Sequence, residues 1–308
     1  MPCFNPSVLA VMPWKDEKGG SILKYAGKYI GDSLAYDYRI RDNTVYRIVP
    51  CGQCIGCRLD NSRQWAVRGV HEASLYDNNC FLTLTFREEC LPDDLSVRIE
   101  HVQRFIKNLR KKYGSGIRYF GCGEYGDKFG RPHYHIILFN FDFSDKQYYF
   151  TNKHGDKCYT SVEAEKRWPY GNVIVAGVSF KSIAYVARYV TKKITGERAD
   201  AHYQGRHPEF VCCSTRPGIG HDWLDKFGEQ CYDKGGKIDF DGHVINTPRY
   251  YDKIWAQKHP EWIEAIKEYR QRDAARHLAD NTPDRLAVRE ELMHIRKNLL
   301  PRSLESEI

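Results

Sequence analysis

The chain has 308 residues, enough for one large domain or two ordinary ones, and its 42% hydrophobic and 28% charged residues are typical of a globular protein. Its apolar segments are far too short to span a bilayer, and its N-terminus lacks the basic start and long apolar run of a signal peptide. These features predict a cytoplasmic protein with no membrane partner. The net charge of +7 is a modest excess that permits a nucleic-acid partner without requiring one.

Hydrophobic periodicity predicts a mixed order of strands and helices. The predicted strands are a weak one in "TVYRIVP", then Cys80–Phe86, 116–124, 133–141 and 171–178. The predicted helices are 61–77, 99–114, 181–194, 261–278 and 283–299. Asn61 or Ser62 could cap the first helix, and Gly114 could end the second.

A short loop joins the strand that ends at Glu124 to the strand that begins at His133, which predicts an antiparallel hairpin. We therefore expect an α+β fold with a central antiparallel sheet and helices on one side of it. The expected organisation is an N-terminal segment with a cysteine cluster and a helix (1–77), a central core (78–196) and a C-terminal extension of unknown role (197–308). That extension could pack on the core as one domain.

Three of the eleven cysteines are bunched in "PCGQCIGCR": Cys51, Cys54 and Cys57. Without an export signal a disulfide framework is not expected. The iron–sulfur spacing needs a fourth cysteine where Asn61 stands. A structural zinc site needs four ligands, and either Cys3 or Cys80 could supply the fourth. Reduced buried thiols and a redox role are the alternatives.

The stretch "GRPHYHIILFNF" carries His133 and His135, which share one face of a strand with about 7 Å between them. An isolated pair of this kind is more often structural than metal-binding. Glu124, however, would lie nearly opposite His133 in the hairpin and supply a third ligand. Two imidazoles and a carboxylate suit Mn²⁺ or another divalent ion, and Mg²⁺ less well.

Gly121, Gly123 and Gly126 match the pattern G-x-G-x-x-G after a strand. A dinucleotide fingerprint must open a helix, whereas "DKFGRPH" and another strand follow here. A nucleotide-binding role for these glycines is therefore rejected.

The predicted helix "SIAYVARYVTKK" places Tyr185 and Tyr189 about 40° apart around the axis, with Lys192 between them. The apolar stripe is complete without the tyrosines, and they share their face with Lys181 and Arg188, so an exposed face is expected. A tyrosine hydroxyl can attack phosphorus and form a covalent phosphotyrosine. A nearby ammonium helps it to ionise, and a divalent ion offsets the charge that develops.

Three ordered motifs, "FLTLTF", "PHYHIILF" and "YVARYVTKK", together resemble the HUH endonucleases that initiate rolling-circle DNA replication. The chain looks most like the replication initiators of gokushovirus-type microviruses, because "VPCGQCIGCRLDNSRQWAVR" is also similar to that group. The resemblance covers about Cys51 to Lys193, and "CCSTRPGIG" more loosely.

The resemblance implies a nick in single-stranded or extruded origin DNA. One tyrosine would attack the scissile phosphate, keep the 5′ end covalently and free a 3′-hydroxyl for a polymerase, and the second would serve the rejoining cleavage. The roles carried over are nucleophiles at Tyr185 and Tyr189, metal ligands at His133, His135 and Glu124, and a helper at Lys192 or Lys193. Host replication proteins such as a helicase and a polymerase are the implied partners.

Basic side chains near the predicted site are candidates for phosphate contacts: Arg131, Lys181, Arg188 and Lys193. A solvated helix face is the alternative for such charges. The rival functions are a plasmid initiator or transposase of the same catalytic class, and a zinc-containing DNA-binding module without catalysis.

Overall fold

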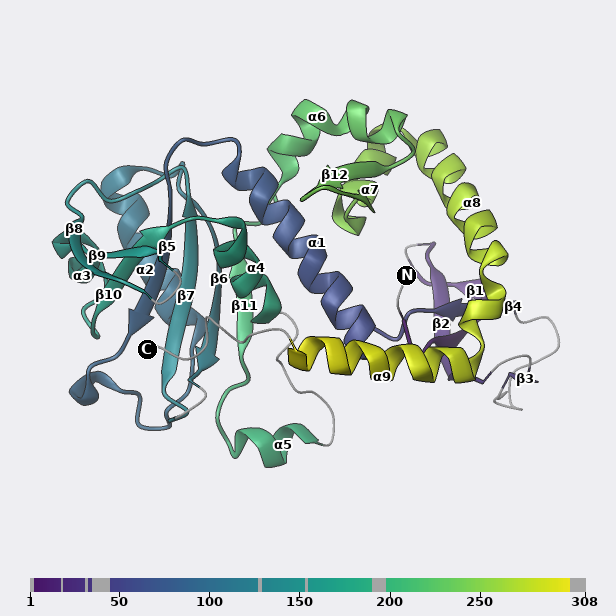
Figure 1. Ribbon diagram of the computed structural model, residues 1–308, viewed down its shortest axis with the longest axis horizontal. Helices are drawn as coiled ribbons and strands as arrows, with labels where there is room; N and C mark the ends of the chain where they lie inside the picture. The colour runs from purple at the N-terminus through teal and green to yellow at the C-terminus, as the bar shows by residue number, and fades with distance from the viewer. Residues whose placement is uncertain are drawn as a thin grey trace. The chain divides into compact units, whose positions relative to one another are not determined.

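The computed structural model describes residues 3–17, 19–30, 33–34, 45–126, 129–152, 155–189 and 198–299 (Figure 1). The described residues up to Asn61 and from Glu264 onward form one compact unit, and those from Ser62 to Ile263 form another. No helix in this described part of the chain has the length and apolar character that crossing a membrane would need.

The larger unit is built on a seven-stranded antiparallel sheet with the order β11-β6-β7-β5-β10-β9-β8. Its strands are β5 (Asn79–Thr85), β6 (Arg118–Tyr125), β7 (Pro132–Phe139), β8 (Gln147–Thr151), β9 (Lys157–Thr160), β10 (Val173–Gly177) and β11 (Phe210–Cys213). The α+β class with a central antiparallel sheet is therefore confirmed. The histidine strand β7 lies inside the sheet, between β6 and β5.

Helices cover both faces of this sheet, not one face as expected from the sequence (Figure 1). The helices of the unit are α1 (Ile55–Ala73, from Ser62 onward), α2 (Ile99–Tyr113), α3 (Val162–Arg167), α4 (Phe180–Arg188), α5 (Arg198–Tyr203), α6 (His221–Asp233) and α7 (Arg249–Lys258). β12 (Lys237–Phe240) and β13 (His243–Asn246) form a small hairpin, and β12 contacts α6. Successive residues of β7 are apolar and point to opposite faces of the sheet, so both faces must be buried.

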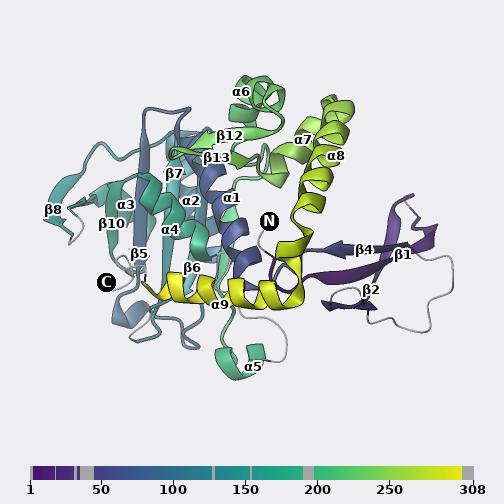
Figure 2. The same ribbon diagram turned by 45° about the vertical axis from the view of Figure 1, so that its right-hand side comes forward.

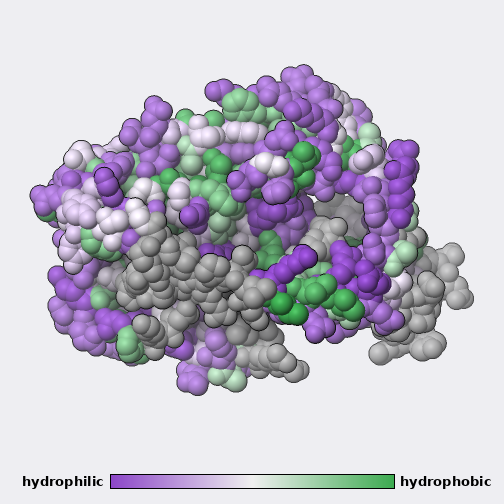
Figure 3. Space-filling model, viewed as in Figure 1, coloured by the Kyte–Doolittle hydropathy of each residue, from purple (hydrophilic) through white to green (hydrophobic). Residues whose placement is uncertain are grey.

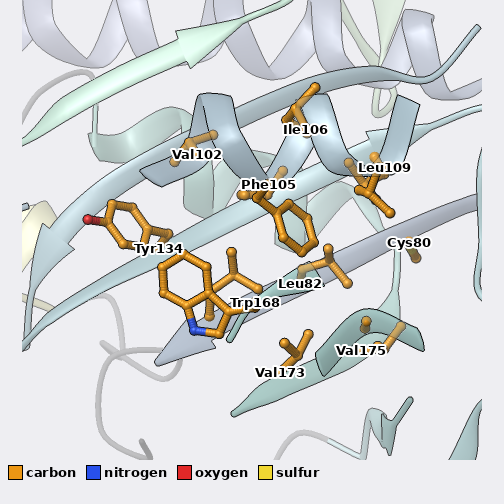
Figure 4. Close-up of a cluster of buried hydrophobic side chains, with 14 of the residues drawn as sticks. Cys80, Leu82, Val102, Phe105, Ile106, Leu109, Tyr134, Trp168, Val173 and Val175 are labelled. Carbon is orange, nitrogen blue, oxygen red and sulfur yellow. The ribbon is translucent and has the colours of Figure 1, made fainter. Parts of the chain in front are cut away.

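The first face of the sheet packs against α2 (Figure 4). Tyr134, Ile136 and Leu138 alternate along β7 and are fully buried. The stripe that meets them on α2 consists of Val102, Phe105, Ile106 and Leu109. Each such side chain contributes about 1.5–3 kcal/mol on burial, so this core fixes the strand that carries the histidines.

The second face of β7 packs against α1 and α4. These two helices approach closely at Gly69, where a Cβ would lie 2.5 Å from Ile183 Cγ2. A side chain at position 69 would push the helices apart. The second core therefore holds α4, with its tyrosines, directly over the sheet.

The limits of two predicted helices differ from the structure, and the first of them ends at Ala73 and not at residue 77. α1 begins at Ile55, so Asn61 and Ser62 lie inside the helix and do not cap it. Cys54 therefore directly precedes α1 and Cys57 lies in its first turn, whereas the predicted helix begins after both. α4 spans Phe180–Arg188 with Tyr189 as its C-cap, and the predicted continuation to residue 194 lies outside the described residues.

His71 is a buried histidine on α1, and its ring stacks on Trp223 with 3.5 Å between ring centroids. Its Nδ1 lies 3.0 Å from the Tyr251 hydroxyl. Burial lowers the pKa of His71 to about 3 from the usual value near 6.5.

A depressed histidine pKa makes the sheet unit sensitive to acid. The unfolded chain takes up a proton at position 71 below about pH 6.5, whereas the folded chain does so only near pH 3. As the pH is lowered from about 6.5 to about 3, the free energy of unfolding is therefore expected to fall. His71 alone contributes up to about 1.4 kcal/mol per pH unit to this fall. Denaturant titrations of the protein and of His71→Phe across the window measure it. Equal pH slopes would contradict the prediction.

The smaller unit contains a four-stranded sheet with the order β3-β2-β1-β4 (Figure 2). Its strands are β1 (Ser7–Lys15), β2 (Ser21–Ile30), β3 (Ser33–Leu34) and β4 (Val45–Val49). Only β4 is predicted from the sequence. α8 (Pro260–Arg276), which starts in the larger unit, and α9 (Pro283–Leu299) match the two predicted C-terminal helices. Hydrophobic side chains gather over α9 in the view of Figure 3, where Val288, Leu292 and Ile295 are exposed.

Candidate active site

The β6–β7 hairpin brings a carboxylate and two imidazoles together. Glu124 is paired with His133 across the hairpin, as the sequence predicts, and Cys122 is paired with His135. Glu124 Oε1 lies 2.9 Å from His133 Nε2 and 2.8 Å from His135 Nε2. The three side chains could hold one metal ion, because their ligand atoms all lie within 4.8 Å of one another.

The other ring nitrogen of each histidine also has a partner. His133 Nδ1 lies 3.2 Å from the Arg131 carbonyl oxygen, which can only accept a hydrogen bond. His135 Nδ1 lies 3.1 Å from Thr83 Oγ1 on β5, the residue paired with His135 across the sheet. These contacts turn both Nε2 atoms towards Glu124. Metal-binding histidines are oriented in this way by a hydrogen bond from the second nitrogen.

The donor set fits a divalent ion. Burial alone would raise the pKa of Glu124, but its hydrogen bonds with His133 and His135 outweigh burial and hold that pKa well below the usual range. The carboxylate is therefore ionised although it is only 2% exposed. Two imidazole nitrogens and one carboxylate oxygen suit Mn²⁺ or a related ion, and leave positions for other ligands.

Thr83 is a positioning residue that sequence reasoning missed, although it lies in the strand motif "FLTLTF". Replacing it with valine keeps the volume and removes the hydroxyl that orients His135. We expect Mn²⁺ affinity to fall roughly 10–100-fold, as for other partners of metal ligands. Isothermal titration of Mn²⁺ measures it, with Thr160→Val as the matched control. Unchanged affinity in Thr83→Val would contradict the role.

Both candidate nucleophiles lie beside this group. Tyr185 Oη lies 3.2 Å from Glu124 Oε1 and 3.4 Å from His135 Nε2. The Tyr189 ring is stacked on that of His135 at 6.2 Å and meets the Tyr185 ring edge-on at 5.1 Å. The sequence therefore correctly places the two tyrosines on one side of the helix.

The expected exposure of that side is wrong. Tyr185 and Tyr189 are 6% and 2% exposed and belong to the second core, whereas Lys181 and Arg188 are exposed. The buried arc of α4 is wider than its apolar stripe, because the helix is enclosed by the sheet and α1. Burial, followed by the Glu124 carboxylate, raises the pKa of both tyrosine hydroxyls. Both tyrosine hydroxyls therefore stay protonated unless a cation at the site stabilises the phenolate.

The predicted basic helpers are placed only in part. Lys192 and Lys193 lie outside the described residues. Arg131 forms an ion pair with Glu88 and donates a hydrogen bond to the Phe86 carbonyl oxygen at 3.1 Å. Its guanidinium is therefore already engaged by protein groups.

Two further cations remain at the helix. The Arg188 guanidinium lies 5.7 Å from the centre of the Tyr185 ring. Lys181 lines a pocket that His135 and Tyr185 also line. These two side chains are placed where a phosphate at the site could meet them.

The first two glycines of the G-x-G-x-x-G pattern have structural roles. β6 runs into the hairpin and not into a helix. A Cβ at Gly123 would lie 2.7 Å from the Phe210 ring of β11, and one at Gly121 would lie 2.9 Å from the His135 carbonyl oxygen. Close packing within the sheet therefore explains Gly121 and Gly123, whereas a Cβ at Gly126 would meet only ordinary contacts at 3.8 Å.

Four thiols gather in the smaller unit with their sulfur atoms within 4.8 Å of one another: Cys3, Cys51, Cys54 and Cys57. Backbone N–H groups point at the sulfurs, from Phe4 to Cys54 at 3.3 Å and from Cys54 to Cys51 at 3.2 Å. Cys3 is thus the fourth member of the group. The alternative, Cys80, is buried in the core of the larger sheet. None of the eleven cysteines, all of which lie within the described residues, forms a disulfide bond.

An antiparallel sheet that presents a carboxylate and two imidazoles beside paired tyrosines defines a candidate metal-dependent site. The family described as "Replication-associated protein ORF2/G2P" matches residues 79–194, which contain all of these residues.

Curated phage proteins are similar over most of the chain. "Replication-associated protein VP4" of Bdellovibrio phage phiMH2K is 35% identical over 76% of this chain and 76% of its own. "Replication-associated protein ORF2" of Spiroplasma virus 4 is 33% identical over 90% of this chain and 88% of its own. "Replication-associated protein ORF4" of Chlamydia phage 1 is 30% identical over 72% of this chain and 57% of its own. No solved structure matches.

The chain therefore belongs to the replication-associated protein ORF2/G2P family of microvirus phages, the gokushoviruses. It is a replication-associated protein of small single-stranded DNA phages.

Proposed function

We propose that this protein is a site-specific endonuclease that nicks and rejoins single-stranded DNA through a 5′-phosphotyrosine intermediate. It would thereby initiate and terminate rolling-circle replication of a small circular phage genome. The observation that carries the proposal is the contact of Tyr185 Oη with Glu124 and His135. A candidate nucleophile and a candidate metal site share one spot on the sheet.

The residues of the chain would divide the work as follows. Glu124, His133 and His135 would hold a divalent ion, Mn²⁺ or Mg²⁺, which when bound neutralises charge on the scissile phosphate. Tyr185 Oη donates a hydrogen bond to Glu124 Oε1, which holds the hydroxyl beside the place of that ion. The phenolic proton would pass to water as the new bond forms. The new bond joins Oη to phosphorus while the bond from phosphorus to the 3′ oxygen breaks, and the 3′ oxygen takes up a proton.

Tyr189 would serve the second cleavage, in which the newly made end is cut and the ends are rejoined. Its ring contacts Tyr185 and His135 from the C-cap position of α4. The two hydroxyls are thus carried by one short, packed segment. A freed 3′-hydroxyl would prime a host polymerase, with a host helicase opening the duplex, in the bacterial cytoplasm.

A gel assay tests this function. The protein is incubated with Mn²⁺ and single-stranded oligonucleotides that tile the genome encoding it, and is then run under denaturing conditions. A covalent protein–DNA adduct on one oligonucleotide is expected, and none with His133→Ala. DNA binding without any adduct would leave a non-catalytic DNA-binding module as the function.

We propose also that the four thiols hold a structural zinc ion. Tetrahedral Zn–S bonds of about 2.3 Å require sulfur atoms about 3.8 Å apart, and Cys54 Sγ lies 4.0 Å from Cys3 Sγ. The N–H groups of Gln53 and Cys54 both donate to Cys51 Sγ, which suits a thiolate. Four sulfur ligands complete the coordination, so the ion would clasp the N-terminal segment to the start of α1 and take no part in cleavage.

A further inference from the structure

A pocket of about 580 Å³ adjoins the candidate active site in the larger unit, and His135 and Tyr185 form part of its wall. Its other sides come from β5, β10, the β8–β9 hairpin and the first turn of α4. We propose that this pocket receives one unpaired nucleobase of the DNA strand, next to the phosphate that Tyr185 attacks. The inference rests on the proposed function. Pockets of this size can enclose a small organic ligand.

The floor of the pocket is apolar and continuous with the site. Phe81 of β5 is paired with Ala176 of β10, and Thr83 with Ile174, so these four side chains share one face of the sheet. The Phe81 ring is stacked on that of His135, with 5.4 Å between centroids and 16° between planes. A base lying on this floor would therefore sit directly beside the candidate metal ligands.

Two neighbouring aromatic residues form the outer wall. Tyr149 and Phe150 are 62% and 38% exposed, on the edge strand β8. Consecutive residues of a regular strand point to opposite faces, yet both of these line the pocket. The pairing of β8 with β9 shifts register between Tyr148 and Phe150, and a bulge of this kind re-aims side chains. The strand thus turns two aromatic rings, the usual platforms for unpaired bases, to one pocket.

The polar groups of the pocket suit a base better than a free anion. Thr85, Thr160 and Asn172 supply hydroxyl and amide groups that can meet the edge of a base. Asp156 and Glu165 also line the pocket, and their charges disfavour a free nucleotide rich in phosphates. Lys181 also lines the pocket, and its ammonium could contact one phosphate of the DNA backbone beside the bound base.

Binding measurements separate this inference from the cleavage reaction. All proteins carry Tyr185→Phe and Tyr189→Phe, so that binding is read without a cut, and a fluorescent single-stranded oligonucleotide of mixed sequence is the probe. Fluorescence anisotropy should show roughly 5–150-fold weaker binding for Tyr149→Ala, the range that one base–aromatic stack contributes. Tyr269→Ala on α8, 54% exposed, is the matched control and should bind normally.

A second variant fills the pocket instead of opening it. Ile174→Trp places a large side chain on the floor and should also weaken binding, with the fold checked by circular dichroism. Normal binding by both Tyr149→Ala and folded Ile174→Trp would overturn the inference, even where adduct formation succeeds. Weaker binding by both supports the pocket, even where no adduct forms and the proposed cleavage fails.

An abasic scan places the base relative to the cut. In proteins with both tyrosines intact, oligonucleotides lacking one base at each position around the mapped cut are compared for adduct formation. Removal of the base at one position should slow adduct formation by the wild-type protein. With that oligonucleotide, wild type and Tyr149→Ala should form the adduct at the same rate. If every abasic position leaves that difference intact, the base does not occupy the pocket.

Discussion

Replacing Tyr185 and Tyr189 together with phenylalanine is expected to reduce covalent adduct formation by at least about 10³-fold, because no nucleophile would remain at the site. The rings pack against His135 and against each other, and phenylalanine keeps these contacts. DNA affinity and thermal stability should therefore change little. Quantified denaturing gels of protein and labelled oligonucleotide measure the loss.

The single variants should differ. Tyr185→Phe should lose more of the first cleavage than Tyr189→Phe, because the Tyr185 hydroxyl contacts both Glu124 and His135. Tyr113→Phe, at the end of α2, is the control and should form the adduct normally. An undiminished adduct in the double variant would show that neither residue is the nucleophile.

The second large effect concerns the four-cysteine group. The purified protein is expected to contain one zinc ion per chain by elemental analysis, and Cys54→Ser should contain none. Metal binding at closed thiolate sites contributes on the order of 10 kcal/mol to folding in small zinc domains. Loss of the ion should therefore release the N-terminal segment, seen as rapid proteolysis between the start of the chain and α1.

Cys90→Ser is the matched control, because Cys90 lies outside the group and packs against the core of the larger unit. It should retain both zinc and protease resistance. Metal-free protein whose N-terminal segment resists proteolysis as well as wild type does would instead identify four reduced thiols. Iron in place of zinc would contradict the proposed ligand chemistry.

The arrangement of the candidate metal ligands is largely predictable because it depends on local rules. Alternation along β7 fixes which face His133 and His135 share, and the short connection from Glu124 fixes the register of the hairpin. The amphipathic stripe of α2 likewise fixes which of its sides is buried. These features need only neighbouring residues, so the sequence carries them directly.

Other features depend on contacts between distant segments. Thr83 meets His135 only when β5 pairs with β7. Cys3 meets Cys51, Cys54 and Cys57 only when the chain folds back after the N-terminal strands. The burial of Tyr185 depends on α1 as well as the sheet, which a helical wheel does not include. Such side chains carry no local signal of their own.

The N-terminal sheet shows the same limit. β1 and β2 pair with irregular register, and β1 carries Pro13 while β2 carries Gly27, so the alternation typical of strands is weak. Their pairing with each other and with β4 is what stabilises them. Similarly, the short edge strands β8 and β9 gain their conformation from the sheet beside them.

The proposed cleavage is tested most directly by identifying the residue that becomes attached to DNA. The adduct is digested with nuclease and protease, and the remaining peptide is sequenced by mass spectrometry. We expect a phosphotyrosine linked to the 5′ end of the cut strand, on Tyr185 in the first cleavage, in a peptide that begins after Lys181. Attachment to a residue other than Tyr185 or Tyr189, or through a 3′-phosphate, would contradict the proposed cleavage.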